Sequence, residues 1–187
     1  MAKNRAFIIL DRDGVINVES KNYIKTPEEW LPLPGSLEAI GLLSQTGYTV
    51  VVATNQAGVG RGLYTEIDLA NIHQKMQDSL KQFGGKIDQI FYCPHHPDTA
   101  CHCRKPESGL FEQIADYYQM DLTGIHSIGD SLRDIQAARK VGCQPSLVLT
   151  GNGEKTLLNN QELVNEIPIF SDLKCAVETL LQEKQHV

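Results

Sequence analysis

A short apolar run that ends in two aspartates constrains this chain more than any other feature. Residues 7–10 read Phe-Ile-Ile-Leu, and Asp11, Asp13 and Gly14 follow directly. Such a run is typical of a buried parallel strand, and open α/β sheets carry their sites at the carboxyl ends of those strands. Two carboxylates this close repel each other unless a cation binds them, and Mg²⁺ is the usual cation for oxygen ligands. One of them could also be a nucleophile, although Asp-x-Asp-Gly occurs in calcium loops and ordinary turns as well.

Strand-like and helix-like segments alternate along the rest of the chain. The expected strands cover residues 5–10, 48–53, 89–93, 125–128, 145–149 and 167–170. The expected helices cover residues 36–45, 66–83, 108–118, 131–141 and 172–183. Thr65 fits an N-cap, and Gly47 and Gly142 stand where helices commonly end in glycine. This alternation favours an α/β fold, a doubly wound parallel sheet with helices on both faces.

Two segments interrupt the alternation. Residues 15–34 contain three prolines and the only tryptophan, Trp30, and are expected to form an irregular flap. Residues 94–106 form a loop rich in cysteine, histidine and proline. Neither segment is long enough to fold as a second domain, so residues 1–187 are expected to form one domain. Within it, the flap covers about 15–34 and the metal-binding loop about 93–104.

The composition limits the classes of function. A net charge of −6 argues against broad binding of nucleic acid. The apolar runs are too short to span a membrane, and the polar N-terminus lacks the pattern of a signal peptide, so a cytoplasmic location is expected. Five cysteines, an odd number, do not suggest a disulfide framework. Nothing in the sequence argues for a partner chain, and a monomer is expected.

Three further polar segments are expected at the same edge of the sheet as the two aspartates. Thr54 ends the second strand, where its hydroxyl and the backbone after it could bind a phosphate. Arg104 and Lys105 are adjacent cations that could hold a phosphoryl oxygen. Asp130 ends the fourth strand and would be another oxygen ligand, while Asp134, one helical turn later, could touch Lys105 or face water. Taken singly, each segment could also be a polar turn or a solvated surface charge.

Together and in this order, the four segments resemble the haloacid-dehalogenase (HAD) superfamily of phosphohydrolases. The corresponding motifs here are Asp11-Arg-Asp13-Gly14-Val15, Thr54-Asn55, Lys105-Pro106 and Gly129-Asp130-x-x-x-Asp134. The resemblance implies that Asp11 is the nucleophile that forms an aspartyl-phosphate and that Asp13 is the general acid and base. It also implies that Thr54 and Lys105 hold the phosphoryl group. The dehalogenases of the superfamily lack the second aspartate, so Asp13 favours phosphate-ester hydrolysis.

Two metals are expected. The resemblance implies Mg²⁺ bound by Asp11, the backbone carbonyl of Asp13 and Asp130. The loop offers three thiolates and one imidazole, a set suited to structural Zn²⁺. We assign this set to Cys93, His95, Cys101 and Cys103. His96 and His102 are spare imidazoles that could replace His95. A fully ligated zinc has no open coordination position, so its role would be to fix the loop and position the cations that follow it.

Within the superfamily, this loop looks like that of the D-glycero-D-manno-heptose 1,7-bisphosphate 7-phosphatases and the related histidinol-phosphate phosphatases, which are compact and lack a large cap domain. The resemblance implies removal of the 7-phosphate in ADP- or GDP-heptose biosynthesis, with histidinol phosphate as the alternative substrate. The residues expected to bind the substrate are Arg12, Glu19, Ser20, Lys21, Asn22, Asn55, Gln56, Ala57 and Arg104. The heptose branch often carries lysine after the fourth-motif aspartate, where this chain has Ser131.

Two other readings of the sequence are a nucleic-acid end phosphatase and a zinc-stabilised binding module without catalysis. The acidic net charge and the absence of a basic, aromatic stripe weigh against the first. The complete set of aspartates, Thr54 and Lys105 weighs against the second.

Overall fold

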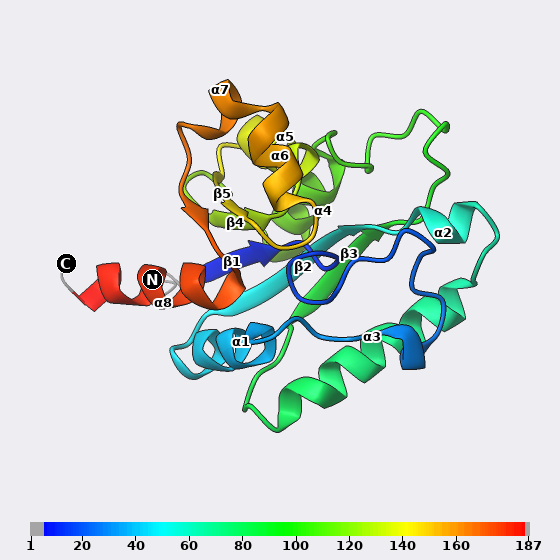
Figure 1. Ribbon diagram of the computed structural model, residues 1–187, viewed down its shortest axis with the longest axis horizontal. Coiled ribbons are helices and arrows are strands. Elements are labelled where there is room, and N and C mark those ends of the chain that lie inside the picture. The colour runs from blue at the N-terminus through cyan, green and yellow to red at the C-terminus, as the bar shows by residue number, and fades with distance from the viewer. Residues whose placement is uncertain (1–5, 186–187) are drawn as a thin grey trace.

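The computed structural model describes residues 6–185, and its strands form one parallel sheet in the order β3-β2-β1-β4-β5-β6 (Figure 1). The strands are β1 (Phe7–Leu10), β2 (Thr49–Asn55), β3 (Gln89–Cys93), β4 (His126–Gly129), β5 (Gln144–Val148) and β6 (Ile169–Phe170). The six expected strands and the doubly wound parallel sheet are confirmed, with bounds that shift by at most two residues. Arg5, placed in the first expected strand, lies outside the described residues.

The strand order creates a switch point beside β1. The chain first builds outward from β1 to β2 and β3, and then returns to pair β4 against the free edge of β1. Loops that leave β1 and β4 therefore run in opposite directions and leave a crevice between them. In open α/β sheets, ligands bind in such a crevice at the carboxyl ends of the strands. This end of the sheet is where the predicted motifs lie.

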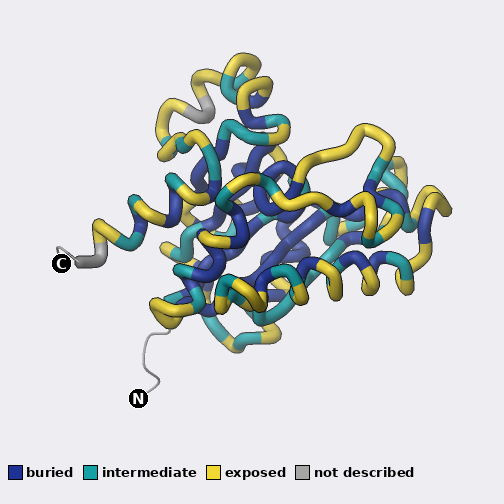
Figure 2. Tube along the Cα trace, turned by 60° about the horizontal axis from the view of Figure 1, so that its bottom comes forward, coloured by how far each residue is buried: buried dark blue, intermediate teal, exposed yellow. Residues whose placement is uncertain are grey.

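Helices cover both faces of the sheet (Figure 1). One face packs against α1 (Ser36–Gln45), α3 (Glu66–Lys81) and α8 (Leu173–Gln185), and the other against α4 (Gly109–Tyr118) and α5 (Leu132–Lys140). Side chains of β1 alternate between the two cores, with Ile8 and Leu10 in the first and Phe7 and Ile9 in the second. Figure 2 shows the buried strands enclosed by helices whose outer sides are exposed.

The helix α3 illustrates how local sequence specifies an element. Thr65 opens it with a capping box, in which Asp68 N–H donates to the Thr65 hydroxyl at 3.1 Å and the Asp68 carboxylate accepts from Thr65 N–H at 2.8 Å. A cap of this kind stabilises a helix by about 1 kcal/mol. The buried side chains are spaced by three or four residues, at Leu69, Ile72, Met76 and Leu80. The predicted N-cap is confirmed, as are the helix-terminal glycines Gly47 and Gly142, both with positive φ.

Four short elements were not expected from the sequence. They are the 3₁₀ helix η1 (Pro27–Glu29) and the helices α2 (Ala57–Gly60), α6 (Gly153–Asn159) and α7 (Gln161–Val164). Elements of three to seven residues contain too little of the helical period to be recognised. The flap is irregular as predicted, but Ile24 and Trp30 anchor it in the core below. Among the helices of residues 6–185, none has the length and apolar composition needed to cross a bilayer.

Candidate active site

A cavity of about 250 Å³ opens at the carboxyl ends of the strands, between the flap, the end of β2, the loop before α4 and the start of α5. Thirteen of the fourteen residues predicted for the catalytic, substrate and magnesium sites line it: Asp11, Arg12, Asp13, Glu19, Ser20, Lys21, Thr54, Asn55, Gln56, Ala57, Arg104, Lys105 and Asp130. The exception is Asn22, which is exposed; its N–H donates to the Ser20 hydroxyl and its carbonyl accepts from Lys25. The topology therefore brings together segments more than a hundred residues apart.

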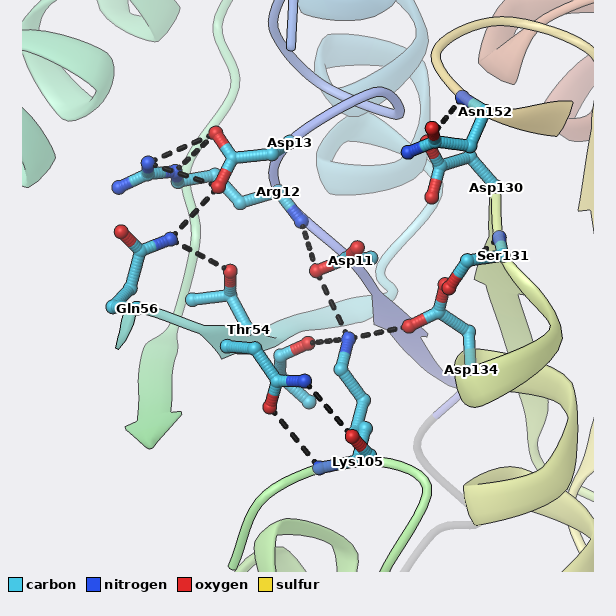
Figure 3. A network of polar contacts seen from close by, with 12 residues as sticks. Asp11, Arg12, Asp13, Thr54, Gln56, Lys105, Asp130, Ser131, Asp134 and Asn152 are labelled. Carbon is cyan, nitrogen blue, oxygen red and sulfur yellow. Dashed lines mark hydrogen bonds and ion pairs between the residues drawn. The ribbon is translucent and has the colours of Figure 1, made fainter. Parts of the chain in front are cut away.

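Lys105 lies at the floor of the cavity between two carboxylates (Figure 3). Its ammonium is 3.0 Å from Asp11 Oδ1 and 2.5 Å from Asp134 Oδ1, and it donates to the carbonyl of Ala53 at 2.7 Å. Burial alone would lower the pKa of Lys105, but the two carboxylates raise it, so the side chain stays charged. Of the two readings of Asp134, contact with Lys105 is the one that the structure shows, and exposure to water is wrong.

Three carboxylates bring an oxygen within 4.8 Å of one another: Asp11, Asp130 and Asp134. Burial raises the pKa of Asp11 to about 7, against the opposing charge of Lys105 and with added repulsion from Asp134. Burial also raises the pKa of Asp130 to about 8, with repulsion from Asp134 and Asp11. Asp134 already accepts from Ser131, through its N–H at 3.0 Å and its hydroxyl at 2.5 Å. The cluster thus holds more negative charge than its surroundings stabilise, which fits a divalent cation between Asp11 and Asp130.

Asp13 has the opposite environment, although it lies only two residues from Asp11. Arg12 Nη2 is 2.9 and 3.0 Å from its two oxygens, and Gln56 Nε2 donates to it at 2.8 Å (Figure 3). Asn17 Nδ2 donates to it as well, at 2.9 Å. Burial raises the pKa of Asp13, but the charge of Arg12 and the hydrogen bonds outweigh burial and lower it. Adjacent carboxyl groups whose pKa values are shifted in opposite directions are a typical arrangement for separate catalytic roles.

The end of β2 organises the wall between these groups. The Gln56 amide donates to both Asp13 and the Thr54 hydroxyl, at 2.8 and 2.9 Å, while its oxygen accepts from the Tyr64 hydroxyl at 2.7 Å. The Asn55 side-chain amide donates to the carbonyl of Lys105, and its oxygen accepts from Lys105 N–H, each at 3.0 Å. Strand β2 thereby fixes Thr54 and Lys105 relative to each other, although the two residues are far apart in the sequence.

Several cavity residues carry no signal that sequence reasoning could use. Tyr23 and Ile24 in the flap, Tyr64 before α3, and Asn152 after β5 reach the site only through the fold. Asn152 N–H donates to Asp130 Oδ2 at 2.7 Å, and its side chain bonds Glu19 in the flap. Arg133, by contrast, lies inside the fourth motif and on the cavity wall, where its spacing from Asp130 could have identified it.

The four predicted zinc ligands are brought together in the loop after β3, where Cys93, His95, Cys101 and Cys103 place their ligand atoms within 4.8 Å of one another. The Sγ atom of Cys101 is 3.7 Å from that of Cys93 and 3.8 Å from that of Cys103. Two sulfurs at 2.3 Å from one tetrahedral zinc would lie about 3.8 Å apart. The spacing of the sulfur atoms therefore fits the metal that the ligand types favour.

The two spare imidazoles have other neighbours. His102 Nε2 lies 2.6 Å from Glu112 on α4, whose other oxygen accepts from Ser108 at 2.6 Å. His96 Nδ1 lies 3.5 Å from a carboxylate oxygen of Asp98. The structure thus places His95, and neither of the alternatives, in the cluster of thiols.

Comparisons with known proteins agree with this geometry. A family model described as HAD-hydrolase-like matches residues 102–176. The D-glycero-β-D-manno-heptose-1,7-bisphosphate 7-phosphatase of Bordetella bronchiseptica is 52% identical to this chain, over 94% of this chain and 98% of its own length. The chain belongs to this 7-phosphatase family, within the HAD superfamily. The family member from Pseudomonas aeruginosa is 49% identical over 96% of this chain and 99% of its own.

Solved structures place the chain in the same HAD family. The crystal structure of the B. bronchiseptica D,D-heptose 1,7-bisphosphate phosphatase, complexed with magnesium and phosphate, has a TM-score of 0.92 and covers 95% of this chain and 98% of that one, at 52% identity. The phosphatase from Burkholderia thailandensis has a TM-score of 0.74 and covers 94% of this chain and 97% of that one, at 40% identity. The sequence-based assignment to HAD-type phosphatases is confirmed.

Proposed function

We propose that this chain is a Mg²⁺-dependent phosphatase that removes the 7-phosphate of D-glycero-D-manno-heptose 1,7-bisphosphate, in the route to nucleotide-activated heptose. The observation that carries the proposal is the pair Asp11 and Asp13, two carboxyl groups of opposite character at the end of one strand. The substrate is inferred from relatives of that name that are about half identical over nearly the full chain.

In the proposed reaction, an Asp11 oxygen attacks phosphorus in line while the bond from phosphorus to the sugar oxygen breaks. Asp13 gives its proton to the departing oxygen, and in the second half takes a proton from the water that hydrolyses the aspartyl-phosphate. The anionic phosphate raises the pKa of Asp13 as it binds, because a like charge disfavours the carboxylate. Proton uptake by Asp13 therefore accompanies substrate binding, although Arg12 keeps the free enzyme's carboxylate ionised.

Thr54 and Lys105 hold the transferring phosphoryl group in this proposal. Both are almost fully buried, and Lys105 is already 3.0 Å from Asp11. The ammonium thus offsets charge on the phosphoryl oxygens and on Asp134 together. Mg²⁺, when held by Asp11, Asp130 and the backbone carbonyl of Asp13, supplies further charge neutralisation at the phosphoryl oxygens.

The sugar and its second phosphate would occupy the outer part of the cavity. Lys21 from the flap, Arg104 at the end of the metal-binding loop and Arg133 on α5 are cations on its wall. Glu19, Ser20, Asn22, Asn55, Gln56 and Ala57 are the remaining residues that we propose for the substrate site. Ser131, where the heptose branch often has lysine, caps α5 and bonds Asp134. We propose that the contact of that lysine is supplied by other cations of the wall.

The proposal treats the chain as one phosphatase domain that works as a monomer in the cytoplasm on a small phosphorylated sugar. A single sheet passes through all the strands of residues 6–185, which supports one domain. The net charge of −6 is unfavourable for nucleic acid as a partner. Zn²⁺ in the four-ligand loop would be structural, and its role would be to position Arg104 and Lys105.

The test is phosphate release, with Mg²⁺ present, from heptose 1,7-bisphosphate and histidinol phosphate side by side. We expect kcat/KM to favour the heptose by at least about a hundredfold, which corresponds to roughly 2.7 kcal/mol of transition-state discrimination. A preference for histidinol phosphate would overturn the substrate while leaving the chemistry in place. Equal, Asp11-independent release from both would overturn the phosphatase assignment.

A further inference from the structure

Arg12 is a buried cation that faces Asp13 on one side and a histidine on the other. Only 1% of Arg12 is exposed, and its Nε and Nη2 atoms contact the Asp13 carboxylate at 2.9–3.2 Å. Its Nη1 lies 3.2 Å from Nε2 of His73, a residue of α3 that is 61 positions away in the sequence. A buried guanidinium N–H without an acceptor would cost several times the free energy of an ordinary hydrogen bond. His73 therefore satisfies the donor that Asp13 cannot reach.

The surroundings of His73 keep its imidazole neutral. Burial, and next the charge of Arg12, lower the pKa of His73 to about 3. The ring packs edge-on against Tyr92 of β3, with centroids 6.1 Å apart. Since Arg12 can only donate, the Nε2 atom of His73 must be the acceptor, and the proton of the neutral ring lies on Nδ1. An acidic residue at this position would form a second ion pair with Arg12 and weaken its pairing with Asp13. A neutral acceptor such as His73 leaves Asp13 as the carboxylate that pairs with Arg12.

We propose that His73 is a positioning residue for the phosphatase reaction. It fixes the orientation of the Arg12 guanidinium, so that Arg12 holds Asp13 in place for proton transfer. The inference rests on the proposed role of Asp13. His73 is not among the residues that line the described cavity, so it acts through Arg12 and not on the substrate. The chain of contacts is His73 Nε2, Arg12, then Asp13, and each link is 3.2 Å or shorter.

Three substitutions separate this role from simple packing. His73→Gln places an amide oxygen near the position of Nε2, whereas His73→Asn is polar but too short to reach Arg12, and His73→Phe keeps the ring without an acceptor. We expect His73→Gln to stay within about threefold of wild type, and His73→Asn and His73→Phe to lose at least about tenfold in kcat/KM, with KM little changed. Asn71→Ala, an exposed site on the same helix, is the matched control.

The decisive readout compares leaving groups. An alkyl phosphate, such as the heptose bisphosphate, needs a proton on its leaving oxygen, whereas p-nitrophenyl phosphate releases a stable phenolate without one. Because kcat/KM reports the formation of the aspartyl-phosphate, loss of Asp13 positioning should lower it much more for the alkyl ester. A packing defect would lower both by the same factor. Asp13→Asn, measured beside the His73 variants, sets the full size of this difference.

The outcomes are distinct. A tenfold or greater excess loss on the alkyl ester in His73→Phe and His73→Asn, restored in His73→Gln, supports the inference. Equal losses on both esters in these variants, while Asp13→Asn shows the excess, overturn it. If Asp13→Asn itself shows no excess, the proposed role of Asp13 fails, and the inference fails with it. Should His73→Phe not fold, the comparison of His73→Asn with His73→Gln decides alone.

Discussion

The carboxylate cluster under the flap and the thiol cluster of the loop differ in how their members are brought together. In the carboxylate cluster, Asp11 follows the end of β1. Its partners Asp130, after β4, and Asp134, at the start of α5, lie about 120 residues later in the chain. The four members of the thiol cluster lie within eleven consecutive residues, from Cys93 to Cys103. Asp130 and Asp134 are buried, whereas His95 is exposed.

This difference predicts a different task for each of the two proposed metals. The sheet holds the carboxylates together whether or not a cation is present, so the folded chain stores their repulsion and a cation relieves it. In the thiol cluster, the local chain has few buried side chains, and a bound metal would itself supply the cross-link. The fold therefore positions the carboxylate ligands before a metal binds, whereas a metal bound by the thiol cluster would itself stabilise the loop.

The largest effect should come from the carboxylate cluster. Asp11→Asn removes the proposed nucleophile, and we expect phosphate release to fall on the order of 10⁴-fold or more. Zinc content, measured by atomic emission on the purified protein, should not change, because the two clusters share no ligand. Substantial turnover in Asp11→Asn would contradict the covalent role, and a loss of zinc would contradict the independence of the clusters.

Loss of the loop metal should have a smaller effect. Cys103→Ala removes one ligand, and we expect zinc loss together with a fall of about ten- to a hundredfold in kcat/KM even with saturating Mg²⁺. The reason is that Arg104 and Lys105 follow the cluster directly. Cys175→Ala, on α8 and outside the cluster, is the control and should keep both zinc and activity. Full activity in verified zinc-free protein would refute the positioning role.

The stored repulsion predicts how pH affects the benefit from Mg²⁺. Because the folded pKa values of Asp11 and Asp130 are raised to about 7 and 8, the folded protein binds more protons than the unfolded chain between about pH 4 and pH 8. Without Mg²⁺, these groups therefore make the protein less stable as pH rises through that window. Stabilisation by Mg²⁺ should be larger at pH 8 than at pH 5, by about 1–3 kcal/mol.

Thermal unfolding of the zinc-loaded protein, with and without Mg²⁺ at each pH, measures this difference. Asp130→Asn should remove most of the dependence, since it removes one charge of the cluster. An Mg²⁺ effect that is the same at both pH values would show that the carboxylates are not the groups that bind it.

The smallest effect should follow from His102→Ala. His102 contacts Glu112 at an exposed position, and exposed ion pairs contribute about 1 kcal/mol or less. We expect zinc content to stay the same and the melting temperature to shift by a few degrees at most. His95→Ala, in contrast, should lose zinc. If His102→Ala lost zinc and His95→Ala kept it, the assignment of the imidazole ligand would be wrong.

The sequence predicted those parts of the fold and the site that rest on local signals. The run before Asp11 is apolar because both faces of a central strand are covered, and a polar residue at its end is therefore conspicuous. The same reasoning located Thr54 and Asp130. The thiol cluster was predictable because its ligands lie close together in the chain, where spacing alone limits the geometry.

The rest could not be predicted, because it depends on contacts between distant elements. His73 shows only the spacing of a helical residue, and its contact with Arg12 depends on how α3 packs in the folded chain, 61 residues further along the sequence. Tyr64 and Asn152 reach the cavity in the same way, through loops whose paths the whole sheet determines. The short helices α2, α6 and α7 were missed for the related reason that they depend on tertiary packing and not on periodicity.

The pair of hydrogen bonds between the Asn55 side chain and the Lys105 backbone also bears on how the loop between β3 and α4 could vary. One end of the loop is fixed by this pair, and the other by Gln56 N–H and Gly60 N–H, which donate to the carbonyls of Cys93 and Pro94 at 2.8 and 2.7 Å. Both attachments lead to one short stretch, from Asn55 at the end of β2 to Gly60 at the end of α2. None of the residues between His96 and Cys101 lines the cavity. Insertions or deletions there can therefore change the length of the loop without displacing the lysine, so that the loop can diverge while the chemistry is inherited unchanged.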